Sequence, residues 1–200
     1  MTSVVDPLDI GLARRTFEAA RRAEAMGIVE PGPIRVDAGS IRRLAASVRR
    51  AGIATSAADI ITNVEAPTAA DLDALLQMVV AALEASPAPE YEWKGLARVF
   101  PPEDLAALLN VSVSSLKRYE SGERKTPDPV AARLHFVALV VGDLAGSYND
   151  TGIRRWFQRK RSQLEGRAPA ALLVADWDPD DEEPRRVREL AQSLVTLSAT

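Results

Sequence analysis

Apolar residues recur at intervals of three and four along almost the whole chain, which is the spacing that places them on one face of an α-helix. Alternating β-branched runs bounded by tight turns, the pattern typical of strands, are nearly absent. The clearest stretch begins at Thr68, an N-cap residue followed three positions later by Asp71, and its leucines and valines line one side over 72–83. The spacing predicts an all-α protein.

Prolines and glycines cut this helical pattern into segments. Helices are expected over 7–26, over 40–51, from Thr68 to the SPAP segment at 86–89, and over 128–141, 149–161 and 183–197, with a short element at 91–100. In the 128–141 helix, Asp128 is expected as the N-cap and Pro129 at the first helical position. Each proline of SPAP removes a hydrogen-bond donor and disfavours helical geometry in the residue before it, so a domain boundary is expected near residue 89. The predicted domains are 1–88, 89–146 and 147–200.

The composition is that of a globular protein, with 46% hydrophobic and 26% charged residues. The absence of cysteine excludes disulfides and thiolate chemistry and suits a reducing compartment. The first residues lack the basic flank and long apolar stretch of a secretory signal, and no apolar run reaches the roughly 18 residues of a membrane span. We therefore expect a cytoplasmic protein with no membrane partner.

Opposite charges are separated along the chain, although the net charge is only −3. Residues 111–167 hold eleven basic side chains and six acidic ones, whereas the segment DWDPDDEEP at 176–184 is strongly acidic. The acidic segment has no His or Cys nearby and lacks the spacing of a calcium loop, so no metal is expected there. It leads into the last predicted helix, where its carboxylates complement the positive end of the helix dipole.

The segment LAALLNVSVSSLKRYESGER at 105–124 has the features of a helix-turn-helix. Ala106 is a small residue for the point where the helices cross, Asn110 tolerates the left-handed conformation of the turn, and Ser112 suits the N-cap of the second helix. In such a motif the second helix enters the major groove, and flanking Lys and Arg contact phosphates. The residues expected to contact DNA are Ser112, Ser114, Ser115, Lys117, Arg118, Tyr119, Arg124 and Lys125. The other interpretation is a helical hairpin whose polar face is merely solvated.

The sequence contains no recognisable catalytic motif. The single histidine, His135, falls inside the apolar segment 130–141, where a histidine bonded within the core is the more common arrangement. No cysteine and no glycine-rich phosphate loop is present. We therefore expect a protein that is not an enzyme and that uses no cofactor.

From about residue 96 onward the chain resembles the Xre/MbcA/ParS antitoxins. The matching pieces are, in order, LNVSVSSLKRYESGER, the apolar helix ARLHFVALVVGDL, the segment GIRRWFQRKRSQLEGRAPAALL and the terminal VRELAQSL. In the third piece a Trp-containing helix is followed by Leu164, Gly166, Pro169, Leu172 and Leu173, which is similar to the family's signature. The resemblance implies an Xre-like helix-turn-helix in 89–146 and a small helical toxin-binding domain in 147–200. The N-terminal helical region 1–88 lies outside the resemblance, and its role stays open.

The resemblance further implies an antitoxin that neutralises a co-encoded toxin, often a RES-domain enzyme that consumes NAD, and represses its own operon by binding operator DNA. The residues carried over to the toxin interface are Arg154, Arg155, Trp156, Gln163, Arg167, Arg185, Arg186 and Arg188. A homodimer or a larger hetero-oligomer with toxin is expected, because one helix-turn-helix reads only a half-site. A stand-alone transcription regulator whose C-terminal domain only oligomerises, and a scaffold that does not use Lys117 and Arg118, stay open as alternatives.

Overall fold

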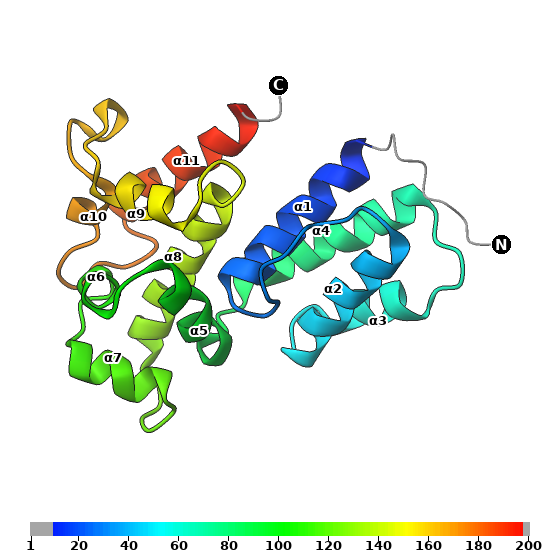
Figure 1. The fold of residues 1–200 in the computed structure, drawn as a ribbon, viewed down its shortest axis with the longest axis horizontal. Coiled ribbons are helices and arrows are strands. Elements are labelled where there is room, and N and C mark those ends of the chain that lie inside the picture. The colour runs from blue at the N-terminus through cyan, green and yellow to red at the C-terminus, as the bar shows by residue number, and fades with distance from the viewer. Residues whose placement is uncertain (1–9, 198–200) are drawn as a thin grey trace. The chain divides into compact units, whose positions relative to one another are not determined.

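The computed structural model describes residues 10–197, and side chains as far as residue 194 (Figure 1). The described chain is all-α, as the spacing of apolar residues predicts. It forms two compact units, of which the first comprises the described residues up to 24 together with 28–86 and the second comprises 25–27 together with 87 onward. The division falls inside the SPAP segment, and residues 89–146 and 147–200, expected as separate domains, lie together in the second unit.

The first unit is built from four helices, α1 (Ile10–Ala25), α2 (Ala38–Arg50), α3 (Thr55–Asn63) and α4 (Ala69–Ala85). The capping predicted for α4 is confirmed: the Thr68 hydroxyl accepts from the Asp71 N–H, and the Asp71 carboxylate accepts from the Thr68 N–H, both at 3.1 Å. Behind this cap, α4 buries a stripe of leucine and valine. The predicted first helix began at residue 7, and residues 7–9 lie outside the described part of the chain.

Helix α3 is not among the helices expected from the sequence. It begins after Ala54, which has a left-handed φ of 48°, and it buries Ala57, Ala58 and Ile61. Only nine residues long, it contains too few turns for an apolar period to stand out. Its packing against both α2 and α4 is what completes the first unit.

The second unit is arranged around one almost fully buried helix. Its elements are α5 (Pro89–Val99), α6 (Pro102–Leu108), α7 (Val113–Glu120), α8 (Asp128–Leu144), α9 (Asp150–Gln158), the 3-10 turn η1 (Ser162–Leu164), α10 (Pro169–Leu172) and α11 (Glu182–Leu197). Residues 133–144 of α8 are all buried, and α5 and α11 pack against it. The helix expected over 128–141 is therefore present, and it lies at the centre of the second unit.

Several predicted helix ends differ from the observed ones by one to three residues; α8, for example, ends at Leu144 and not at 141. The N-cap of α8 is Pro127, whose carbonyl accepts from the Ala131 N–H at 2.9 Å, so that Asp128 is already the first helical residue. Helix α9 starts after Asn149 as expected, but it ends at Gln158 instead of near 161. The backbone of Arg161 is extended there, because its N–H donates to the Arg167 carbonyl and its own carbonyl accepts from the Gly166 N–H.

Within residues 10–197, none of the helices combines the length and the apolar composition that crossing a bilayer requires.

A buried Glu–His pair joins α5 to α8. The Glu92 side chain is fully buried and its Oε1 lies 2.5 Å from Nδ1 of His135, which is itself only 6% exposed. Burial raises the pKa of the Glu92 carboxyl above its usual 4.5, and the hydrogen bond from His135 only partly opposes this effect. The expectation that His135 is a core residue with a bonding partner is confirmed.

We expect Glu92→Gln to change how stability depends on pH. The folded state holds the Glu92 proton at pH values where the unfolded chain has released it, so wild-type stability falls as pH rises from 4.5 to the raised pKa. Relative to Glu92→Gln, the wild-type free energy of unfolding should fall by up to about 1.4 kcal/mol per pH unit in that window. Urea unfolding of both proteins at a series of pH values measures this, and a difference that stays constant with pH would contradict it.

Candidate functional site

Helices α6 and α7 are joined by a turn that is closed by two backbone hydrogen bonds. Asn110 adopts a left-handed φ of 53°, the Val111 N–H donates to the Ala106 carbonyl at 3.0 Å, and the Asn110 N–H donates to the Ala107 carbonyl at 3.2 Å. These two bonds form a Schellman motif, which satisfies carbonyls that the end of α6 would otherwise leave free. Ala106 is 3% exposed at the crossing of the two helices. The local chemistry expected for this turn is therefore present.

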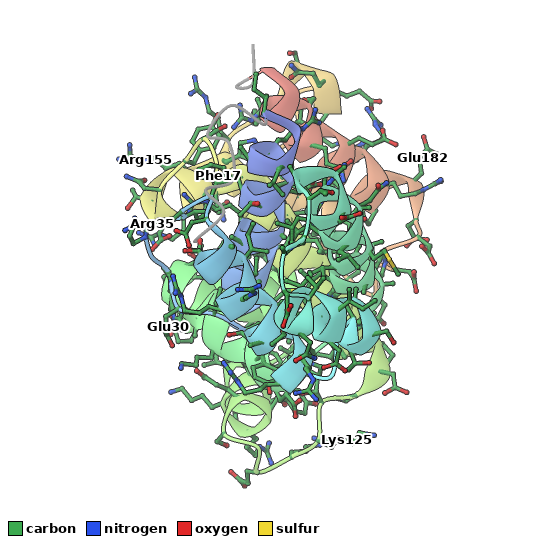
Figure 2. All side chains as sticks on the ribbon, turned by 90° about the vertical axis from the view of Figure 1, so that its right-hand side faces the viewer. Phe17, Glu30, Arg35, Lys125, Arg155 and Glu182 are labelled. Carbon is green, nitrogen blue, oxygen red and sulfur yellow. The ribbon has the colours of Figure 1, made fainter. Side chains whose placement is uncertain are left out.

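Helix α7 has one buried face and one exposed face. The Ser112 side chain caps it by accepting from the Ser115 N–H at 3.1 Å, and Leu116 lies buried beneath it. The exposed residues on and just after α7 include Ser114, Lys117, Arg118, Arg124 and Lys125. Among the described residues these four cations have no carboxylate partner. Figure 2 shows Lys125 on the loop that follows α7, far from Arg155 of α9.

Tyr119, which is expected to contact DNA, does not belong to the exposed set, because the structure buries most of its side chain. It is 8% exposed and stacks on Trp93 of α5, with ring centroids 6.1 Å apart. The guanidinium of Arg124 lies 5.6 Å from the centre of the Tyr119 ring. Tyr119 therefore anchors α7 to α5 and holds Arg124 beside the exposed face of α7.

The turn after α6 is also held by residues that are distant in sequence. The Trp177 indole N–H donates to the Leu108 carbonyl at 2.9 Å, and the Arg133 guanidinium donates to the carbonyls of Leu109 at 3.3 Å and Trp177 at 2.7 Å. Arg133 and Trp177 are both buried, and the guanidinium lies 5.8 Å from the Trp177 ring centre. Sequence reasoning missed this cluster, although a lone arginine in the apolar run of α8 was a signal that a buried partner existed.

One further contact of this cluster lies at the surface. The Asn110 side-chain amide donates to Oδ1 of Asp176 at 3.0 Å, and Arg133 reaches the same oxygen at 3.4 Å. The Asp176 side chain is 89% exposed. The acidic segment thus contacts the α6–α7 turn directly.

The residues expected at a toxin interface divide into two groups. Four of the arginines are engaged within the unit: Arg154 donates to the Val99 carbonyl, Arg167 pairs with Glu183, Arg186 pairs with Glu165, and Arg188 lies near Asp143. Arg155, Gln163 and Arg185 are exposed. The exposed members come from α9, η1 and α11, which all belong to the C-terminal part of the second unit.

Trp156 lies in the core and not on the surface. It is 1% exposed, and its ring meets Phe157 edge to face at 5.3 Å, with the Arg161 guanidinium 5.5 Å from the ring centre. Its indole N–H has no acceptor among the described residues. The Trp156 side chain, expected at a toxin interface, is thus covered by its own unit.

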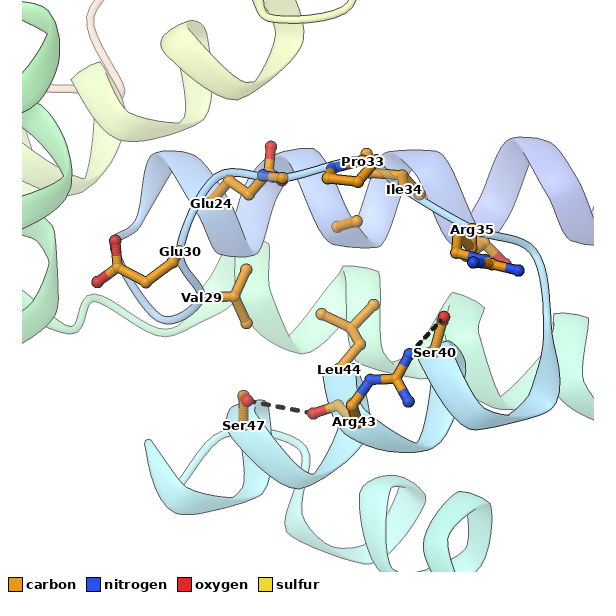
Figure 3. Close-up of a pocket in the computed structure, with 13 residues that line it drawn as sticks. Glu24, Val29, Glu30, Pro33, Ile34, Arg35, Ser40, Arg43, Leu44 and Ser47 are labelled. Atoms are coloured by element: carbon orange, nitrogen blue, oxygen red, sulfur yellow. Dashed lines mark hydrogen bonds between the residues drawn. The ribbon is translucent and has the colours of Figure 1, made fainter.

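The first unit has an open pocket of about 270 Å³ between α1, the segment 29–35 and α2 (Figure 3). Its lining mixes apolar side chains such as Val29 and Leu44 with charged ones. Two of these charges are already bonded, since Glu24 accepts from the Gly32 N–H and Arg43 donates to the Ser40 hydroxyl. No group of three His, Asp or Glu side chains able to hold a metal ion occurs in the described residues.

Comparison of the chain with protein-family models, curated proteins and solved structures finds no match.

Proposed function

We propose that the second unit binds double-stranded DNA through a helix-turn-helix formed by α6 and α7, and that the protein is an antitoxin that represses its own operon. The observation that carries the DNA-binding proposal is the exposed surface of α7 and of the loop after it. Serines and two cations lie on α7, two more cations lie in the loop, and none of the four cations has a carboxylate partner among the described residues. Short polar side chains followed by Lys and Arg suit a helix that lies in the major groove.

We assign the exposed residues to two kinds of DNA contact, with bases and with phosphates, according to their positions on and after α7. Ser114 stands in the first turn of α7, and Arg118 follows four residues later on the same face, so both point toward the same groove. Arg118 is suited to a bidentate contact with guanine, worth about 1–3 kcal/mol of discrimination. Lys117, Arg124 and Lys125 flank this pair and are suited to phosphates.

Measured DNA binding tests the proposal directly. Fluorescence anisotropy with overlapping duplexes that cover the DNA upstream of the coding sequence should reveal one duplex bound in preference to the others. If Lys117, Arg124 and Lys125 of one protomer contact phosphates, log K should fall with log salt with a slope of about −3 for each bound protomer. Equal affinity for every duplex would contradict the proposal that the protein recognises a specific DNA sequence.

The antitoxin part rests on the resemblance of 152–173 to the antitoxin signature and on the three exposed residues Arg155, Gln163 and Arg185. Arg and other long polar side chains at such positions suit a protein interface. The partner proposed is a co-encoded toxin of the RES type. Co-expression with the product of the adjacent gene, followed by affinity purification and a growth assay, tests this part.

The internal pairing of the other four arginines favours a second candidate function, a stand-alone regulator whose C-terminal helices only stabilise the fold or oligomerise. The same co-expression experiment separates the two. An antitoxin restores growth and co-purifies with its neighbour, whereas a stand-alone regulator binds DNA and has no effect on any toxin. The matched variant Arg155→Ala with Arg185→Ala should weaken capture of the toxin while leaving DNA binding intact.

A further inference from the structure

The carbonyls of Leu108 and Leu109, at the end of α6, accept hydrogen bonds from side chains that belong to neither α6 nor α7. The C-terminal carbonyls of a helix lack partners within the helix, and most are satisfied by the following turn or by water. Here the Leu108 carbonyl accepts from the Trp177 indole, and the Leu109 carbonyl accepts from Arg133 of α8. Both donors are buried, so these bonds are shielded from water.

The donors themselves form one rigid group with the segment between α10 and α11. The Arg133 guanidinium donates to the Trp177 carbonyl, and the Trp177 ring packs edge to face on Phe136 with centroids 5.2 Å apart. Asp176 then reaches across the surface to the Asn110 amide. A residue of the turn and a residue 66 positions later are thus fixed to one another.

We propose that Asp176 and Trp177 are positioning residues for α7, the helix proposed to enter the major groove. The segment joining α10 to α11 would then set part of the affinity of α7 for DNA. The proposal rests on the proposed DNA binding. The turn 109–112 is the covalent link between α6 and α7, and a contact that fixes Asn110 fixes where α7 begins. Specific DNA contacts need side chains held in the productive geometry, and an unfixed turn lowers affinity without the loss of any contacting residue.

The experiment compares two variants that remove the same charge. Asp176→Ala removes the bonds to Asn110 and Arg133, whereas Asp180→Ala removes a carboxylate of the same segment that has no side-chain bond among the described residues. Both substitutions lessen the repulsion of DNA, so a difference between them reports the contacts that Asp176 makes with Asn110 of the turn and with Arg133 beneath it. Against the preferred duplex, Asp176→Ala should bind about five-fold more weakly than Asp180→Ala, as expected for one hydrogen bond.

Two further readouts distinguish positioning from a direct DNA contact. The salt slope of Asp176→Ala should match that of Asp180→Ala, because no phosphate-binding cation is lost. Asn110→Gly keeps the left-handed backbone and removes the amide donor, and its effect should not add to that of Asp176→Ala in a double-mutant cycle.

The outcomes separate this inference from the proposed function. If wild type binds the duplex and the two aspartate variants bind equally, the positioning role is wrong and DNA binding stands. If wild type binds no duplex, the proposed function fails first. Amide hydrogen exchange at 110–112 in the DNA-free protein then tests the contact alone: exchange faster in Asp176→Ala than in Asp180→Ala supports a held turn, and equal rates overturn it.

Discussion

Replacing Lys117 and Arg118 together by alanine is expected to lower affinity for the preferred duplex on the order of 100-fold. Arg118 is suited to a bidentate base contact and Lys117 to a phosphate, and both side chains are exposed on α7. The single variants should differ in kind. Lys117→Ala should weaken all duplexes alike and reduce the salt slope by about one, whereas Arg118→Ala should also relax discrimination at one base pair.

A control with the same loss of charge is Arg159→Ala with Lys160→Ala. Both residues are exposed and follow α9, which lies at the other end of the second unit from α7 (Figure 1). This control should retain affinity to within about three-fold, the size of a long-range charge effect screened by salt. All four substitutions are at exposed positions, so unfolding free energies should change by no more than about 0.5 kcal/mol. Equal loss of affinity in the two double variants would mean that α7 has no special role.

The parts of this fold that the sequence predicts correctly are those decided by neighbouring residues. The cap at Thr68 needs only Asp71 three positions later, and the turn at Asn110 needs only a residue that tolerates positive φ between two apolar stretches. Because hydrogen bonds between residues close in sequence form such motifs, a few consecutive residues are enough to predict them. Where a cap lacks a side-chain bond, as at Pro127, the predicted start of the helix is off by one residue.

Exposure of individual side chains could not be predicted in the same way. Tyr119 stands among exposed residues of α7, and its burial depends on Trp93, which lies on another helix. Trp156 follows two arginines in α9, and its burial likewise depends on residues outside the local pattern, since α10 packs against α9. In both cases the aromatic ring adds core area to a short helix that also carries charged residues.

Long-range polar contacts were the least predictable part of the candidate site. Arg154 is tied to a carbonyl 55 residues earlier, and the Trp177 indole to one 69 residues earlier. A sequence pattern indicates that a lone charge such as Arg133 in an apolar helix must be compensated, but not by which partner. Four arginines that resemble interface residues therefore turn out to have partners within their own unit.

Replacing either of the two buried tryptophans of the C-terminal part, Trp156 or Trp177, should strongly lower stability. The two differ in one respect: the Trp177 indole N–H has an acceptor, and the Trp156 indole N–H has none among the described residues. Trp156→Ala and Trp177→Ala should each cost about 3–5 kcal/mol of unfolding free energy, as expected for emptying a buried aromatic site. The two phenylalanine variants should differ from one another in their free energy of unfolding. Trp177→Phe leaves the buried Leu108 carbonyl without its donor, whereas Trp156→Phe removes an N–H that has no acceptor among the described residues.

Urea unfolding followed by far-ultraviolet circular dichroism should therefore show Trp177→Phe to be less stable than Trp156→Phe by about 1–3 kcal/mol, the cost of an unsatisfied buried polar group. Both replacements remove the same atoms, so the loss of volume cancels in the comparison. Equal stabilities would contradict the bonding of Trp177 to α6. The Trp156→Phe protein also tests whether Trp156 contacts the proposed toxin. If Trp156 is only a core residue, the variant should still co-purify with the toxin. If Trp156 contacts the toxin, the variant should stay stable and lose the toxin. Because the ring is 1% exposed, we expect capture to be retained.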